Sequence, residues 1–124
     1  MSDNFDYQSA RNFLKEKSER KKQYSSELYL QAKKDADDII LAIQNNFSIT
    51  KIYQWGSLLS PAHFDENSDI DIAVEGLNSA EDFFKLYGIA LSKTSFPLDI
   101  VEMEKIEDLN RKSIIEKGKL VYEK

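Results

Sequence analysis

A long stretch without glycine or proline, from Ser9 to about Phe47, is the feature that most limits the folds open to this chain. It is rich in Lys, Glu, Gln, Ala and Leu, which are good helix formers. Its second half carries apolar residues at steps of three or four, which is the spacing of one face of an amphipathic helix. These residues are Tyr24, Leu28, Ala32, Ala36, Ile39 or Ile40, Ile43 and Phe47. One helix therefore takes almost a third of the 124 residues and leaves a small domain to pack against it.

The first half of this helix has a thinner apolar face. Phe13 and Leu14 are its large anchors, and "KEKSERKK" at residues 15–22 holds five basic and two acidic residues. A helix that extends beyond its core packing either frays or rests on another surface. The charged run predicts a solvated helix face or, as the alternative, a docking arm for a partner or a polyanion.

The rest of the chain alternates between strand and helix patterns, with turn residues between them. Strands are predicted at 49–55, 68–76, 96–103 and 119–123, and helices at 78–93 and 104–118. Asn78 or Ser79 is a candidate N-cap, and Gly118 is a natural C-cap. This order predicts an α/β or α+β domain built on one mixed sheet. We expect a helical extension, 1–48, that packs on a core of 49–124, with one domain overall.

Composition excludes several classes of function. Lys and Arg total 17 against 22 Asp and Glu, and a formal charge of −5 disfavours non-specific binding to nucleic acid, which depends on phosphate neutralisation. There is no cysteine, so disulfides and thiolate metal sites are excluded. No apolar run approaches the ~20 residues of a membrane span, and the N-terminus lacks the apolar stretch of a signal peptide. We expect a soluble cytoplasmic protein.

Three aspartates lie in segments that otherwise resemble buried strands. Because side chains alternate along a strand, Asp69 and Asp71 would share one face while Ile70 and Ile72 take the other. Asp99 stands in the apolar run "LDIV". Carboxylates that are close together and partly buried are costly, and Mg²⁺, which prefers carboxylate and phosphate oxygens, removes that cost. The aspartates suit nucleotidyl transfer if the third strand pairs beside the second. The alternative is a half-exposed strand with its polar face in water.

A Gly-Ser pair follows the first strand directly. Gly56 lets a backbone approach a ligand closely, and Ser57 offers a hydroxyl donor. If a turn of helix begins there, its free N–H groups can bind a phosphate. An ordinary turn is the alternative interpretation of the pair when it is taken alone.

Taken together, Gly56-Ser57, Asp69-Ile70-Asp71 and Leu98-Asp99-Ile100-Val101 resemble the DNA polymerase β-type nucleotidyltransferase superfamily. They are most similar to its minimal single-domain branch in bacteria and archaea, and the ending "IIEKGKLVYEK" resembles the tail of that branch. The resemblance covers roughly residues 49–124. It implies a small mixed sheet with helices packed on one face, and it places Gly56 and Ser57 on the phosphates of the nucleotide. It also implies that Asp69 and Asp71 bind two Mg²⁺ ions, and that Asp99 completes the metal site and helps to deprotonate the acceptor.

The reaction that the resemblance implies moves a nucleoside monophosphate, AMP from ATP, to an acceptor hydroxyl and releases pyrophosphate. Members of the minimal branch pair with a small helical HEPN-type protein and act as antitoxins by adding AMP to one of its tyrosines. A hetero-oligomer or a homodimer fits this expectation. A non-catalytic antitoxin or binding subunit with the same fold is the first alternative. A small-molecule nucleotidyltransferase is the second, for which 124 residues leave little room.

One departure from the family pattern concerns phosphate binding. Where the family has a basic run of the form "GSRARG", this chain has Leu58 to Pro61 and no arginine. Lys51 and Lys93 are the candidates for the missing cation. Trp55 is predicted as a core or sheet aromatic, with stacking on a base as the alternative. His63 is predicted as a solvated loop residue, with a catalytic role as the alternative.

Overall fold

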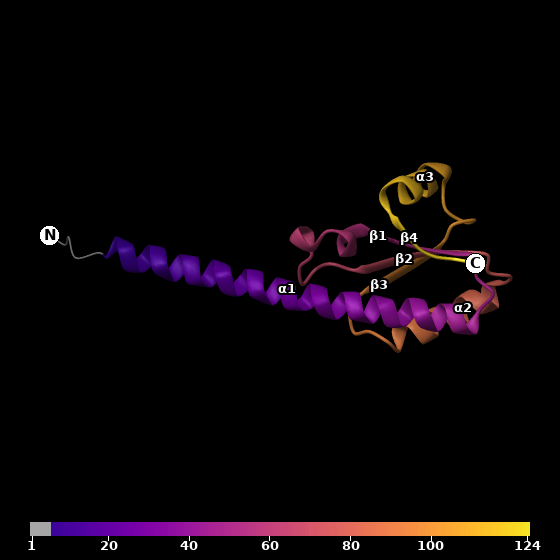
Figure 1. Ribbon diagram of the computed structural model, residues 1–124, viewed down its shortest axis with the longest axis horizontal. Helices are drawn as coiled ribbons and strands as arrows, with labels where there is room; N and C mark the ends of the chain where they lie inside the picture. Colours follow the sequence, from indigo (N-terminus) through magenta and orange to yellow (C-terminus); the bar gives the residue numbers. More distant parts are fainter. Residues whose placement is uncertain (1–5) are drawn as a thin grey trace.

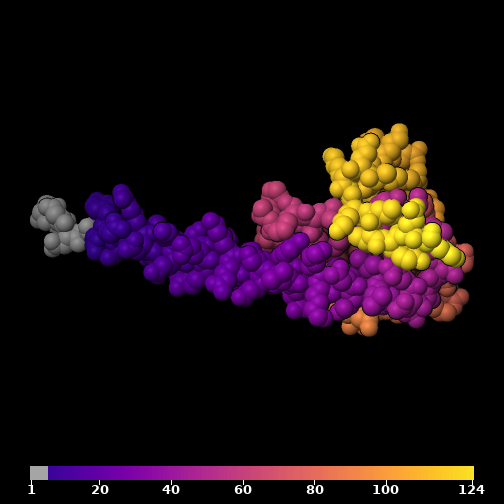
Figure 2. Space-filling view, viewed as in Figure 1, coloured from indigo at the N-terminus to yellow at the C-terminus, as the bar shows by residue number. Residues whose placement is uncertain are grey.

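A 40-residue helix, α1 (Tyr7–Asn46), dominates the computed structural model, which describes residues 6–124. The Asp6 side chain caps its start by accepting the Ser9 backbone N–H at 3.0 Å. The first half of α1 projects away from the rest of the molecule, and its second half lies along the sheet (Figures 1 and 2). The long helix is therefore confirmed. Its predicted apolar face is confirmed from Leu28 onward, but Tyr24 is 52% exposed, because the core ends before that turn.

Four strands form one mixed sheet with the order β3-β2-β1-β4. The strands are β1 (Lys51–Trp55), β2 (Ile70–Glu75), β3 (Leu98–Glu102) and β4 (Lys119–Glu123). Two further helices are α2 (Ala80–Leu91) and α3 (Asp108–Lys117), and the short 3-10 turns η1 (Gly56–Leu59) and η2 (Pro61–His63) follow β1. Each predicted element is present. β1, β2 and β3 each begin two residues later than predicted, and β2 and β3 also end one residue earlier. Both predicted caps are confirmed, with Ser79 capping α2 and Gly118 ending α3.

The helices cover both faces of the sheet. One face carries the main core, where Ile72 of β2 packs with Ile39 of α1 and Leu86 of α2. On the other face Ala73 packs with Ile114 of α3 in a separate, smaller cluster. Figure 1 shows α3 on the side of the sheet opposite to α1 and α2. The expectation that all helices lie on one face is therefore wrong, because apolar residues on the second face also need cover.

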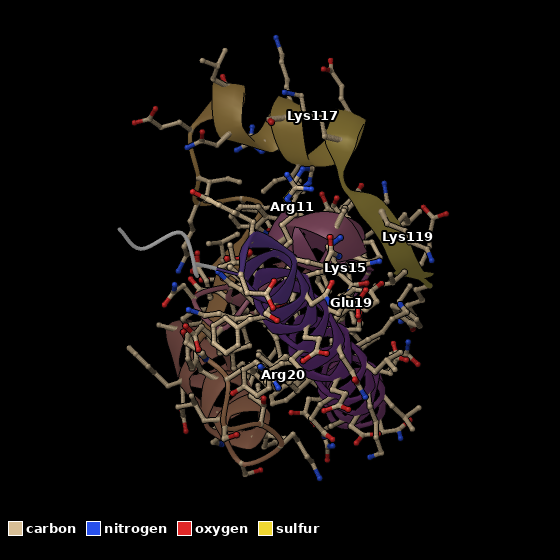
Figure 3. The ribbon with its side chains drawn as sticks, turned by 90° about the vertical axis from the view of Figure 1, so that its left-hand side faces the viewer. Arg11, Lys15, Glu19, Arg20, Lys117 and Lys119 are labelled. Carbon is tan, nitrogen blue, oxygen red and sulfur yellow. The ribbon has the colours of Figure 1, made fainter. Side chains whose placement is uncertain are left out.

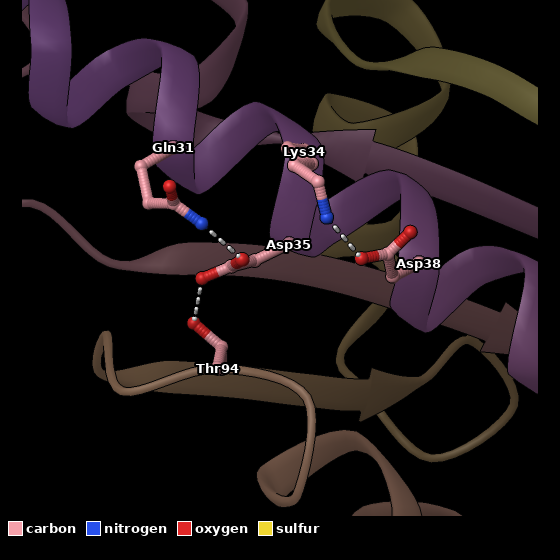
Figure 4. A network of polar contacts seen from close by, with 5 residues as sticks. All are labelled: Gln31, Lys34, Asp35, Asp38 and Thr94. Carbon is pink, nitrogen blue, oxygen red and sulfur yellow. Dashed lines mark hydrogen bonds and ion pairs between the residues drawn. The ribbon is translucent and has the colours of Figure 1, made fainter.

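A buried polar network ties α1 to the loop before β3. Asp35 is only 7% exposed, and its carboxylate accepts hydrogen bonds of 2.8 Å from both Gln31 Nε2 and Thr94 Oγ1 (Figure 4). The Thr94 hydroxyl also accepts the backbone N–H of Phe96 at 3.1 Å. The network therefore fixes the approach of the chain to β3, the strand that carries Asp99.

None of the helices in residues 6–124 combines the length and apolar character that a membrane span needs.

Candidate active site

Three chain segments meet at one end of the sheet. β1 ends there with Trp55, and β2 and β3, which are parallel, begin there. The register places Asp71 directly beside Asp99 on one side and Trp55 on the other. Neighbouring strands lie ~4.8 Å apart, so the two carboxylates project side by side from the same face. The condition that the third strand pairs beside the second is therefore confirmed.

Gly56 lies against the Asp71 carboxylate. A β-carbon at position 56 would overlap Asp71 Oδ2, and Gly56 has φ of 77°, a conformation that side chains rarely adopt. Ser57 lies in the same turn. The backbone N–H of Ser60 closes this turn by donating to the Ser57 carbonyl oxygen at 3.0 Å. The Gly-Ser pair is thus held beside the aspartates, and a larger residue at position 56 would disturb Asp71.

The electrostatics of the site are concentrated on Asp71. Burial raises the pKa of this carboxyl from 3.8 to about 7, and the charges of Asp99 and then Asp69 add to the rise. Asp69 stands one residue before β2 and is exposed, as Asp99 is. The charges of the other two predicted aspartates therefore reach Asp71, the half-buried member of the three.

A divalent cation fits the chemistry of these donors only in company with a ligand. Within residues 6–124, no group of three or more His, Cys, Asp or Glu side chains is arranged to hold a metal ion by itself. Mg²⁺ usually binds one or two protein carboxylates and completes its shell with water and substrate phosphates. Asp71 and Asp99 supply hard oxygens side by side, and burial together with the charges of Asp99 and Asp69 raises the pKa of Asp71. This donor set suits Mg²⁺ that arrives with a nucleotide.

The candidate replacement cations do not account for the missing arginine. Lys51 lies at the far end of β1, where it pairs with Glu123 at 3.7 Å and stands opposite Glu75. That end of the strand is about 13 Å from Trp55 at ~3.3 Å per residue. Lys93 is exposed in the turn after α2, and no ion pair within residues 6–124 involves it. Lys51 is therefore excluded as the phosphate-binding cation, and nothing in the geometry favours Lys93 for that role.

The aromatic and histidine candidates have different surroundings. Trp55 is half-buried and packs beside Ala73 and Met103, as predicted for a sheet aromatic. It also lines two hollows, one that reaches Asp99 and one that reaches Gly56. Its buried indole N–H has no hydrogen-bond partner among the described residues. His63 is exposed in η2, where its Nδ1 lies 2.7 Å from Ser60 Oγ, as expected of a loop residue.

A groove runs between the sheet end and α3. Trp55 and Ser113 line both of its halves. One half, of about 330 Å³, reaches Asp99, and the other, of about 300 Å³, reaches Gly56 and Lys117. Figure 2 shows a recess between the 3-10 segment and α3 on this side of the molecule.

An arginine holds α3 over the groove. Arg111 donates from Nε to the Met103 carbonyl oxygen at 2.7 Å and from Nη2 to that of Ile106 at 3.1 Å. Sequence reasoning did not identify the groove residues of α3. Their spacing (Asn110, Ser113 and Lys117 lie on one helix face) was the available signal.

A Gly-Ser turn beside carboxylates on adjacent parallel strands defines a nucleotidyltransferase-type site. The model of the family described as "Polymerase beta, Nucleotidyltransferase" matches residues 37–124. The chain belongs to this family. The projecting half of α1 lies outside the match. No curated protein matches the chain.

Three solved structures have chains with a similar fold. One is a toxin–antitoxin MntA–HepT structure, with 21% identity over 74% of this chain and 73% of that chain and a TM-score of 0.57. Another is a toxin–antitoxin structure with AMP-PNP, with 24% identity over 72% and 73% and a TM-score of 0.61. A third contains a tri-AMPylated Shewanella oneidensis HEPN toxin in complex with an MNT antitoxin, with 21% identity over 75% and 73% and a TM-score of 0.58. At these identities the similarity shows the fold alone.

Proposed function

We propose that this protein transfers AMP from ATP to a hydroxyl group of a protein partner and releases pyrophosphate. The observation that carries the proposal is the side-by-side placement of Asp71 and Asp99, with Gly56 against the Asp71 carboxylate. A purely structural sheet has no need of a carboxyl group with a raised pKa where its inner strand begins, whereas a nucleotidyl-transfer site requires charge that metal and phosphate can complete.

The residues of the chain have separate tasks in this reaction. Gly56 and Ser57 bind the phosphates, because the glycine permits close approach and the serine adds a hydroxyl donor. Asp69, Asp71 and Asp99 would hold two Mg²⁺ ions, which supply charge stabilisation at the attacking and leaving oxygens. Asp99 is exposed at the start of β3, where it can accept the proton of the acceptor hydroxyl.

The covalent change is a single substitution at phosphorus. The acceptor oxygen forms a bond to the α-phosphorus, and the bond from that phosphorus to the bridging oxygen of pyrophosphate breaks. The proton of the acceptor leaves to Asp99, and the bonding electrons leave with pyrophosphate. Positioning and charge stabilisation carry most of the catalysis in such a transfer. We place the reaction in the cytoplasm, where its nucleotide substrate is available.

The partner that we propose is a HEPN-type helical protein with a tyrosine as the acceptor, so that the protein acts as an antitoxin. Support comes from the shared fold with chains of structures that contain such toxins. The projecting half of α1 is the proposed contact surface. Residues 7–27 hold six basic and three acidic residues. Figure 3 shows Arg11 and Lys15 on the side of α1 towards α3, and Arg20 on another side. An acidic partner surface would complement this arm.

The test begins with calorimetric titration of Mg²⁺ and ATP into the wild-type chain and into Asp69→Asn/Asp71→Asn. We expect metal-dependent binding that the double substitution abolishes, with the fold intact by circular dichroism. Transfer is then measured with ATP labelled on the α-phosphate and a HEPN-type protein as acceptor, in its native form and with its tyrosines changed to phenylalanine. Wild-type protein that binds no nucleotide with Mg²⁺ would refute the proposal.

A non-catalytic antitoxin is the second candidate, favoured by the absence of a basic residue after Ser57 and by the exposed arm. In that case the double aspartate variant would still neutralise the partner, whereas deletion of residues 1–17 would not. The deletion removes no buried side chain of the described residues, so the core is expected to remain folded. The division into an extension, 1–48, and a core, 49–124, stays a prediction, which limited proteolysis would test.

A further inference from the structure

One face of α3 forms the wall of the groove beside the aspartates. Asn110, Ser113 and Lys117 follow one another at steps of three and four, so they lie on the same side of the helix. Ile114, on that side too, is 6% exposed and fastens the helix to the sheet. The groove thus has an apolar anchor at its base and an amide, a hydroxyl and an ammonium group along its rim.

Lys117 is the basic residue that lines the Gly56 half of the groove. Five other basic side chains of the described residues are engaged in ion pairs. Ion pairs hold Lys34 to Asp38, Lys51 to Glu123, Lys85 to Glu81, Lys105 to Glu102 and Arg111 to Asp108. Within residues 6–124, Lys117 takes part in no ion pair. Its charge is therefore available to a ligand.

The backbone fixes the position of Lys117 relative to Gly56. Gly118, the next residue, donates its N–H to the Ile114 carbonyl oxygen at 2.7 Å, and a β-carbon there would crowd that oxygen and the Gln54 carbonyl oxygen. Lys119 then pairs with Gln54, two residues before Gly56. The end of α3 is thus attached to the end of β1, and Figure 3 shows Lys117 at that end of the helix.

We infer that Lys117 binds the triphosphate of the nucleotide and replaces the basic residue that the family pattern has after the Gly-Ser pair. The inference rests on the proposed function. Three carboxylates at the site repel an incoming polyanion, and an unpaired ammonium group beside Gly56 offsets that repulsion. Lysine binds phosphate as a point charge and needs no bidentate geometry, so a flexible side chain at a helix end can serve.

A lysine in the last turn of a helix also complements the helix dipole, so the test must separate binding from stability. The variants are Lys117→Ala, Lys117→Arg and Lys112→Ala. Lys112 is exposed on the opposite side of α3, so its replacement removes the same charge from the same helix away from the groove. Affinity for ATP with Mg²⁺ is measured by calorimetry on the full chain, and thermal unfolding is measured without ligand.

We expect Lys117→Ala to weaken ATP binding about tenfold or more, the value of one charge-assisted hydrogen bond. Lys117→Arg should stay within about threefold of wild type and Lys112→Ala within about twofold, because each keeps a cation at the groove. Equal affinity of Lys117→Ala and Lys112→Ala would overturn the inference, as would equal losses in Lys117→Ala and Lys117→Arg. Either result leaves the proposed function standing, whereas a wild-type chain that binds no ATP with Mg²⁺ refutes the proposed function itself.

Discussion

Asp71→Asn is expected to stabilise the ligand-free protein above neutral pH. In the folded chain the pKa of this carboxyl rises from 3.8 to about 7, because the group is partly buried and faces Asp99 and Asp69. A shift of about three units corresponds to about 4 kcal/mol at full strength, and solvent screening of a half-buried group reduces this to about 1–2 kcal/mol. An asparagine of similar shape carries no charge and avoids this cost.

The sign of the effect follows from proton linkage. The folded state binds the proton of Asp71 more tightly than the unfolded state does, so the contribution of this group to stability is fully present below about pH 3.8. It is lost as the pH rises through about 7. The gap in unfolding free energy between Asp71→Asn and wild type should therefore widen between about pH 4 and pH 7 and stay constant above that range.

Urea unfolding at a series of pH values, with Mg²⁺ removed by a chelator, measures this gap. Asp37→Asn is the matched control, because Asp37 is exposed on α1 and its replacement should change stability by less than about 0.5 kcal/mol at any pH. Added Mg²⁺ and ATP should stabilise the wild type and not Asp71→Asn. A gap in unfolding free energy that does not depend on pH would show that folding does not raise the pKa of Asp71, and it would refute the electrostatic reasoning.

Three further substitutions test the surroundings of the site by denaturant unfolding. Gly56→Ala should cost about 1–3 kcal/mol, because the new β-carbon meets the Asp71 carboxylate at a φ of 77°; an unchanged midpoint would contradict this packing. Asp35→Ala should cost about 1–3 kcal/mol, because Gln31 and Thr94 lose their buried acceptor. Gly88→Ala should stabilise by about 0.5–1 kcal/mol, since Gly88 lies inside α2 with nothing within 4 Å of the added carbon; destabilisation would show a hidden contact.

Local signals predicted most of this fold. The glycine-free stretch, the apolar alternation and the caps each act within a few residues, so they can be interpreted without knowledge of the tertiary structure. The pairing of Asp71 with Asp99 was a conditional prediction, because strand order depends on the whole sheet. The positions of the aspartates followed from period-two alternation once that order was known.

Tertiary packing explains what the sequence did not reveal. The sequence analysis did not single out Asp35, although this buried residue lies on the same helical stripe as Ala32 and Ile39. That placement was a usable signal, since a polar residue on a buried stripe needs a partner. Thr94, which lies 59 positions later, supplies that partner, and no local pattern connects the two.

The place of α3 explains why the aspartates stand where the strands begin. Ala73 follows Asp71 by two residues, and Val101 follows Asp99 by two, so each strand has a carboxylate and then an apolar residue on one face. α3 covers the apolar half with Ile114 and leaves the carboxylate half open. Carboxylates two positions further along would lie under α3 and would carry the full cost of desolvation. The same helix therefore completes the core and forms the groove, and its end carries the cation that the Gly-Ser turn lacks.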